Sequence, residues 1–183
     1  LGCAIRRMQN TFAGHELRGR SLGVVGLGAI GSLVARAALD LGMDVLGFDP
    51  AISVDAAWRL PSEVRRMENL PALLARADYV TLHVPLLDET RHMINAETLK
   101  SLKSGSVLLN FAREPIVETD ALKVALDEGR VGAYVADFPV PALLGHPRAL
   151  LTPHLGASTE EAEENCAVMA ADQLVDFLKT GNI

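Results

Sequence analysis

Residues 22–31, LGVVGLGAIG, decide the fold of this chain. Their first half, 22–26, is an apolar run with the length of a buried strand. The glycines of a G-x-G-x-x-G turn follow, and residues 29–41 then show the apolar spacing of an amphipathic helix. The expected apolar face of this helix consists of Ile30, Leu33, Val34, Ala37, Ala38 and Leu41. The stretch therefore predicts a strand, a tight turn and a helix in direct succession.

Each glycine of the turn has a separate physical purpose. Gly26 permits the tight turn, Gly28 lets a pyrophosphate approach the backbone, and Gly31 lets the helix pack closely on the strand. The free N–H groups at the start of the helix, which is its positive end, then meet the phosphates. This order of elements predicts a dinucleotide-binding site.

A carboxylate at the end of the next apolar run supports the same interpretation. Residues 43–48 are apolar overall and lead into Asp49, which lies 18 residues after Gly31. This is the expected place for an acid that accepts the ribose hydroxyls of the adenosine half. Because a carboxylate there repels a 2′-phosphate, the expected cofactor is NAD rather than NADP. The simpler alternative is that Asp49 and Pro50 only start a turn.

The rest of the chain alternates apolar runs with helical segments. Strands are expected over 22–26, 43–48, 78–84, 106–111, 131–136 and 149–152, and helices over 29–41, 69–76, 96–102, 119–128 and 158–179. Such alternation predicts an α/β fold, a Rossmann-type doubly wound parallel sheet in three α/β/α layers. The core of this single domain is expected over residues 21–157. Residues 1–18 are interpreted as a lead-in helix and residues 51–67 as an irregular surface segment.

The last helix carries the clearest start signal in the chain. Ser158 and Glu161 have the spacing of a capping box, and the acids of residues 160–164 suit the positive end of a helix. No histidine or cysteine pairs with these acids at ligand spacing, so no metal site is expected. Cys166 lies on the apolar side of this helix and is expected to be a buried, reduced thiol.

Composition narrows the classes of partner. The chain has 183 residues, of which 49% are hydrophobic and 22% charged, as in a globular domain. A net charge of −6 argues against a nucleic-acid or acidic-membrane surface. No apolar run reaches the roughly 20 residues that span a bilayer, and no secretory leader is visible. Two cysteines make no disulfide framework. A cytoplasmic protein is expected.

Polar residues follow the predicted strands at the edge where a parallel sheet binds its ligands. The residues in question are Asp49, His83, Asn110, Arg113, Asp137, Thr152 and His154. Taken singly, His83 also fits a structural histidine and Arg113 a solvated loop residue. Together, these residues predict one site along the carboxyl edge of the sheet.

With these residues in place, the chain resembles the D-isomer-specific 2-hydroxyacid dehydrogenases, over almost the whole of their coenzyme domain. The motifs that carry the resemblance are VVGLGAIG (24–31), HVPLLDET (83–90), NFAR (110–113), ADFP (136–139) and TPHLGAST (152–159). Within that family, residues 153–165 are most similar to the enzymes that oxidise D-3-phosphoglycerate. Most of the substrate domain of such enzymes is then absent from this chain.

The resemblance implies a role for several residues. Arg113 would hold the carboxylate and carbonyl oxygen of a 2-oxo acid, and His154 would be the general acid/base. Asp137 would orient the nicotinamide carboxamide. The glycine turn, Asp49 and the resemblance together give the expected cofactor-binding set: Gly26, Gly28, Ala29, Ile30, Gly31, Asp49, His83, Val84, Pro85, Phe111, Ala112, Arg113, Asp137, His154, Leu155, Gly156 and Ala157.

One departure from the family pattern concerns the catalytic histidine. The family places a glutamate five residues after the aspartate that matches Asp137, where it bonds the imidazole and favours its charged form. Here that position is Ala142, and no carboxylate lies between Asp137 and Glu160. We therefore expect His154 to work without this partner, with the acidic limb of the pH–rate profile at lower pH than in relatives that have the glutamate.

Two classes of function follow. The first is an NAD-dependent dehydrogenase, with D-3-phosphoglycerate as the expected substrate and another 2-hydroxy acid as the alternative. The second is an NAD-sensing binding module that resembles the corepressors sharing this fold. The missing glutamate favours the second class, whereas residues 153–165 favour the first. The family also pairs through its coenzyme domains, so a homodimer is expected.

Overall fold

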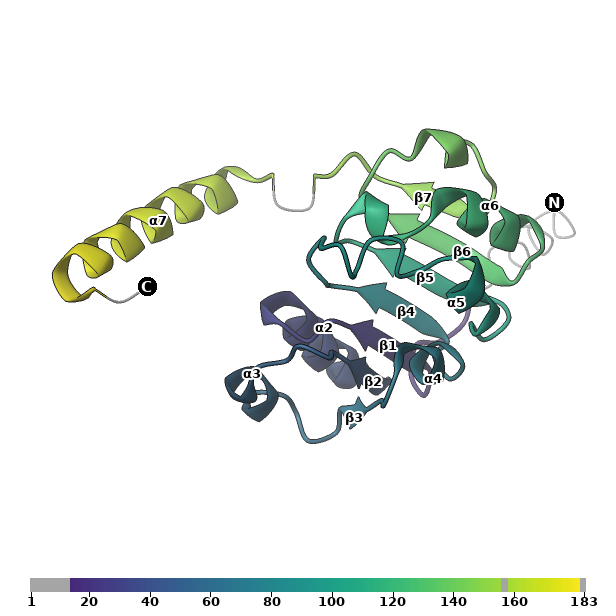
Figure 1. Cartoon of the computed structure of the whole chain (residues 1–183), viewed down its shortest axis with the longest axis horizontal. Helices are drawn as coiled ribbons and strands as arrows, with labels where there is room; N and C mark the ends of the chain where they lie inside the picture. The colour runs from purple at the N-terminus through teal and green to yellow at the C-terminus, as the bar shows by residue number, and fades with distance from the viewer. Residues whose placement is uncertain (1–13, 156–157, 182–183) are drawn as a thin grey trace, which may run out of the picture.

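The computed structural model describes residues 14–155 and 158–181 and contains a single sheet of seven parallel strands (Figure 1). The strands are β1 Ser21–Val25, β2 Asp44–Phe48, β3 Arg65–Arg66, β4 Tyr79–Leu82, β5 Ser106–Asn110, β6 Val131–Ala136 and β7 Ala149–Leu151. The helices are α2 Ala29–Asp40, α3 Val54–Trp58, α4 Leu70–Leu74, α5 Ala96–Lys100, α6 Thr119–Asp127 and α7 Glu160–Thr180. Short 3₁₀ turns lie at Glu114–Ile116 and Pro141–Leu143.

The strand order is β3-β2-β1-β4-β5-β6-β7, so the chain winds outward from β1 in one direction and then from β4 in the other. The expected doubly wound parallel sheet is confirmed. The reversal between β1 and β4 matters for function, because parallel sheets bind ligands in the crevice that forms at such a point.

Side chains from the two faces of the sheet form separate cores. On β1, Val24 belongs to a cluster with Ala35 and Ala38 of α2, whereas Val25 belongs to a larger cluster with α4, α5 and α6. Successive side chains of a strand point to opposite faces. Helices therefore pack on both faces of the sheet, α2 on one face and α4, α5 and α6 on the other, as in a three-layer α/β/α arrangement.

Close packing at the start of α2 explains two of the glycines. Gly26 has a φ of +90°, and a Cβ there would lie 2.7 Å from the carbonyl oxygen of His83. A Cβ on Gly31 would overlap the carbonyl oxygen of Gly26. Alanine at position 26 would therefore push the ends of β1 and β4 apart, and alanine at position 31 would push α2 away from the end of β1.

The face of α2 that meets the sheet differs from the expected one. Gly31, Ala35 and Ala38 are its buried residues, whereas Ile30 and Leu33 are about two-thirds exposed (66% and 65%). Small side chains face the sheet because the helix lies so close to β1 that larger ones would not fit. Apolar spacing predicted the helix and the buried Ala38 correctly, but the contact face that it predicted also contained four residues that are exposed: Ile30, Leu33, Ala37 and Leu41.

Other expectations also require correction. Residues 51–67 contain α3 and the edge strand β3, so this segment is not merely irregular surface. The cap of α7 is Thr159, whose hydroxyl accepts the N–H of Ala162 at 3.1 Å, so the capping box at Ser158 was wrong. The cause is a shift of one residue in the helix start. Cys166 is exposed, not buried, because no residue of α7 is buried and the helix projects from the sheet (Figure 1).

The expected lead-in helix is not tested over most of its length. Residues 1–13 lie outside the described residues, and residues 14–18 form no helix.

The edge of the sheet where the strands begin is held together by a carboxylate just before β4. Asp78 accepts hydrogen bonds from the N–H and the hydroxyl of Ser21, both at 2.9 Å, and from the ammonium group of Lys103 at 2.6 Å. Asp78 thereby ties the beginning of β1 to the turn before β5.

Candidate active site

The carboxyl ends of the strands bring the expected polar residues to one edge of the sheet. Asp49 follows β2, His83 follows β4, and Asp137 follows β6 directly, while Arg113 and His154 come three residues after β5 and β7. Because all seven strands are parallel, these ends share an edge. Leu155 is exposed at the same edge, and Gly156 and Ala157 lie outside the described residues.

Asp49 is already engaged with the backbone around it. One oxygen, Oδ2, accepts the N–H of Leu27 at 2.8 Å, and the other, Oδ1, accepts the N–H of Ala51 at 2.9 Å. The second bond is the turn that the simpler alternative predicted. The first joins the acid to the glycine turn 22 residues earlier in the chain. Asp49 therefore both starts a turn and lies against the glycine turn.

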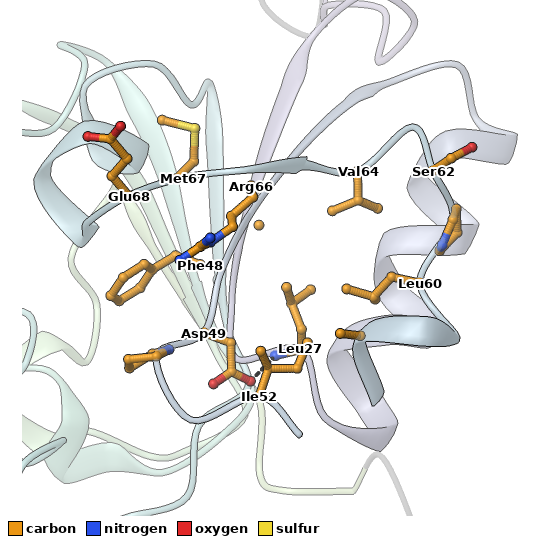
Figure 2. Close-up of a pocket in the computed structure, with 14 residues that line it drawn as sticks. Leu27, Phe48, Asp49, Ile52, Leu60, Ser62, Val64, Arg66, Met67 and Glu68 are labelled. Atoms are coloured by element: carbon orange, nitrogen blue, oxygen red, sulfur yellow. Dashed lines mark hydrogen bonds between the residues drawn. The ribbon is translucent and has the colours of Figure 1, made fainter. Parts of the chain in front are cut away.

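A cavity of about 520 Å³ opens beside Asp49 (Figure 2). Its lining is mainly apolar, and in Figure 2 the side chain of Arg66 reaches in from β3 near Phe48. Much of the wall was missed from the sequence, because it comes from the segment interpreted as irregular surface: Ile52, Ala57, Leu60, Pro61, Ser62, Val64, Arg66 and Met67. The only sign of this wall in the sequence was that the segment contains several apolar residues, although they follow no regular period.

A second cavity, of about 500 Å³, lies on the other side of the glycine turn. It is lined by Gly28, Ala29, Ile30, His83, Val84, Pro85, Leu86, Phe111, Ala112 and Arg113. All but Leu86 belong to the predicted cofactor-binding set, so the structure brings this group together. Leu27 lines the first cavity and Gly28 the second, so the turn separates two spaces of the size that ligand sites have.

His83 is a half-buried wall of the second cavity. Burial lowers the pKa of its imidazole and so favours the neutral ring. Its Nε2 lies 2.9 Å from the hydroxyl oxygen of Thr81. A neutral, hydrogen-bonded ring of this kind presents a flat face to a ligand without adding charge.

The turn that carries Arg113 is held by the buried side-chain amide of Asn110, which the sequence placed at this edge without assigning it a role. Asn110 is fully buried, and its side-chain oxygen accepts the N–H of Ala112 at 3.2 Å. Its amide group donates to the carbonyl of Arg113 at 2.9 Å and to the hydroxyl of Tyr134 at 3.3 Å. Burial raises the pKa of Tyr134 to about 12, so this hydroxyl stays neutral. The guanidinium group of Arg113 is left at the surface and donates to the carbonyl of Ala112 at 2.7 Å.

His154 has the most constrained geometry at this edge. Its φ of 59° lies in the left-handed region, where residues other than glycine are uncommon. Strained backbone of this kind often occurs at functional sites. Its ring stacks on Phe138 with centroids 5.1 Å apart, and its Nδ1 lies 3.0 Å from the carbonyl oxygen of Asp137. Because that carbonyl only accepts, Nδ1 must carry the proton, and Nε2 remains for a ligand.

Asp137 is the acid next to His154. Its Oδ2 lies 3.6 Å from Nδ1 of His154, and its Oδ1 accepts the hydroxyl of Thr152 at 2.6 Å. Ala142, at the position of the family's glutamate, is exposed and has no acidic group. Within residues 14–155 and 158–181, Asp137 is the only acid within ion-pair distance of His154.

The described residues contain neither a metal cluster nor a membrane-spanning helix. Over residues 14–155 and 158–181, no three histidine, cysteine or acidic side chains are grouped so that they could hold a metal ion. Among the helices in these ranges, none has the length and apolar character needed to cross a membrane.

Two cavities flank a glycine turn at the point where a doubly wound sheet reverses its strand order, which is where proteins of this fold bind dinucleotides. Residues 4–156 match the family described as D-isomer specific 2-hydroxyacid dehydrogenase, NAD binding domain. The chain therefore belongs to this family of NAD-binding domains, as the motifs predicted.

Individual relatives are similar over most of the chain. The D-3-phosphoglycerate dehydrogenase of Synechocystis is 41% identical over 91% of this chain and 31% of its own length. The (S)-sulfolactate dehydrogenase of Chromohalobacter salexigens is 40% identical over 91% of this chain and 55% of its own length. The solved structure of a D-2-hydroxyisocaproate dehydrogenase matches with a TM-score of 0.85 at 27% identity, over 100% of this chain and 60% of that one. The chain thus spans between about a third and three-fifths of the length of these proteins.

Proposed function

We propose that this chain is the coenzyme domain of an NAD-dependent dehydrogenase that oxidises D-3-phosphoglycerate to 3-phosphohydroxypyruvate. The observation that supports the activity best is the shared edge of the sheet, which carries His154, oriented by Asp137, and Arg113, which lines the cavity beside the glycine turn. Acid/base, anion-binding and cofactor-binding groups then lie along one edge.

The described residues fit NAD on both sides of the turn. The adenosine half would occupy the apolar cavity beside Asp49, whose oxygens retain lone pairs for the ribose hydroxyls. A Cβ on Gly28 would meet nothing within 4 Å, so the backbone is open to a pyrophosphate there. The N–H groups of Ala29 and Ile30, in the first turn of α2, have no partner within the helix. The nicotinamide end would enter the second cavity.

The chemistry divides between the cofactor and two side chains. When bound, NAD supplies the acceptor for the hydride that leaves C2 of the hydroxy acid. His154 takes the proton of the C2 hydroxyl on Nε2, because Nδ1 already carries a proton directed at the carbonyl of Asp137. Arg113 holds the carboxylate of the substrate through its planar set of donors. In the reverse direction His154 returns the proton.

The choice of phosphoglycerate is supported by the names of the relatives and by a charged group that their substrates share. Phosphoglycerate and sulfolactate are both three-carbon 2-hydroxy acids with a second anionic group, and an enzyme named for each is about 40% identical to this chain. Groups that bind the second anion are expected mainly in the substrate domain. The complete protein is proposed to be a cytoplasmic homodimer that pairs through this domain.

The rival function is an NAD-sensing binding module, and Ala142 is the observation that favours it. The test is NADH formation by the complete polypeptide with D-3-phosphoglycerate, sulfolactate, glycerate and lactate, with H154N and R113A as controls. We expect turnover that is highest with phosphoglycerate and falls at least 100-fold in H154N. NAD binding without turnover of any of these acids would overturn the enzyme and leave the binding module.

A further inference from the structure

The relation between His154 and Asp137 goes beyond what the family pattern assigns. Dehydrogenases of this kind need the catalytic imidazole held in one tautomer and, for reduction, in its charged form. The chain has alanine where a glutamate is expected to do both. The question is which group replaces it.

The backbone of Asp137 can fix the tautomer. Its carbonyl oxygen lies 3.0 Å from Nδ1 of His154, within hydrogen-bond distance. The ring is held against rotation by its stacking on Phe138, at an interplanar angle of 24°. Residue 137 therefore sets the orientation of the imidazole whatever its side chain is.

The side chain of Asp137 supplies the charge. The residue is 9% exposed, and its Oδ1 is held by the hydroxyl of Thr152 at 2.6 Å. This bond orients the carboxylate so that Oδ2 lies 3.6 Å from Nδ1 of His154. At that separation the carboxylate attracts an imidazolium. The side chain of His154 is 61% exposed, so water screens this attraction in part.

We infer that Asp137 is the positioning residue that replaces the missing glutamate: its carbonyl fixes the proton on Nδ1, and its carboxylate stabilises the charged ring. This inference rests on the proposed function for its catalytic meaning, since the charged ring is the form that donates a proton to a 2-oxo acid. The proton balance is simple. Nε2 gains the hydroxyl proton on oxidation and loses it on reduction, while Nδ1 keeps its own throughout.

The experiment compares D137N with E160Q in the complete protein. D137N removes the carboxylate charge and keeps the carbonyl, whereas E160Q removes one charge from the exposed first turn of α7. Nitrogen NMR of the imidazole, assigned with H154N, gives the ratio of charged to neutral His154 at a fixed pH. We expect this ratio to fall roughly 5- to 10-fold in D137N and to stay unchanged in E160Q. Nδ1 should remain the protonated nitrogen of the neutral ring in both.

Activity provides the second readout. In the direction of reduction, the limb of the rate profile that needs charged His154 should move to lower pH in D137N, because the carboxylate that favours the charged ring is gone. Calorimetric binding of NAD shows whether the variant is folded and whether the cofactor site is weakened. An unchanged NMR ratio in folded D137N would overturn the inference even if the enzyme is active. A lowered ratio in a protein that oxidises no hydroxy acid would uphold the pairing and remove only the proposed function.

Discussion

Replacing Asp78 with asparagine should reveal how much one carboxylate contributes to the sheet. Asp78 stands before β4, where it accepts two hydrogen bonds from Ser21 and one from Lys103. Arg20 adds a more distant charge at 3.9 Å. The side chain is only 17% exposed, so solvent screens these contacts weakly. Asparagine keeps the shape and removes the charge.

The magnitude follows from the titration of the carboxyl group. Burial raises the pKa of Asp78, but the bonds from Lys103 and from the backbone and hydroxyl of Ser21 outweigh it and lower the pKa from 3.8 to about 2. A difference of almost two pH units corresponds to about 2 kcal/mol of folding free energy. Because the folded pKa is the lower one, this stabilisation is fully present above pH 4 to 5. It is lost as the pH falls towards 2.

Urea denaturation at several pH values between 7 and 2 tests this. At pH 7 we expect the free energy of unfolding of D78N to be about 2 kcal/mol lower than that of the parent protein. The gap should close as the pH falls, since protonation removes the same charge from Asp78. The control is D44N, because Asp44 is 57% exposed and pairs with Arg65 across 3.4 Å of solvated surface. Such pairs contribute little. If the difference in unfolding free energy between D78N and the parent protein stays constant down to pH 2, the reasoning is refuted.

Three further outcomes follow from the site. D49A should weaken NAD binding by calorimetry at least tenfold and weaken NADP binding far less; equal losses would contradict the assignment of this acid to the ribose. G31A should destabilise the fold by about 1 to 3 kcal/mol in urea and weaken NAD binding, because its methyl group overlaps the carbonyl of Gly26; G14A, at an open position, is the control. N110A should cost about 2 to 3 kcal/mol of stability and lower kcat/KM at least tenfold, because the turn of Arg113 loses its clamp; unaltered turnover would show that the clamp does not position Arg113.

The regular part of the fold was readable from the sequence because local patterns govern it. The six strands predicted from apolar runs all appear, with ends within two residues of the expected ones. Their parallel order follows from alternation with helices, and it is this order that gathers Asp49, His83 and Asp137 at one edge. Knowing the strands was therefore enough to predict the edge at which the polar residues meet.

What the sequence did not reveal depends on tertiary contacts. The inner face of α2 is formed by Gly31, Ala35 and Ala38, because the distance between helix and sheet selects small residues over the larger ones nearby. The hydrogen bonds from Asn110 to the turn of Arg113 form only when the chain after β5 folds back over the Asn110 side chain, and no sequence spacing predicts this. The pairing of Asp137 with His154 joins the ends of two strands 17 residues apart. Each of these depends on how separate elements meet.

The bond between Leu27 and Asp49 has a consequence for how NAD would be held. It connects the residue expected to grip the sugar with the loop expected to receive the diphosphate. Disturbing the acid would therefore also loosen the loop, so the affinity for the ribose and the affinity for the diphosphate depend on each other. Fragments such as adenosine and nicotinamide mononucleotide, measured alone and together, would reveal that interdependence as a departure from additive affinities.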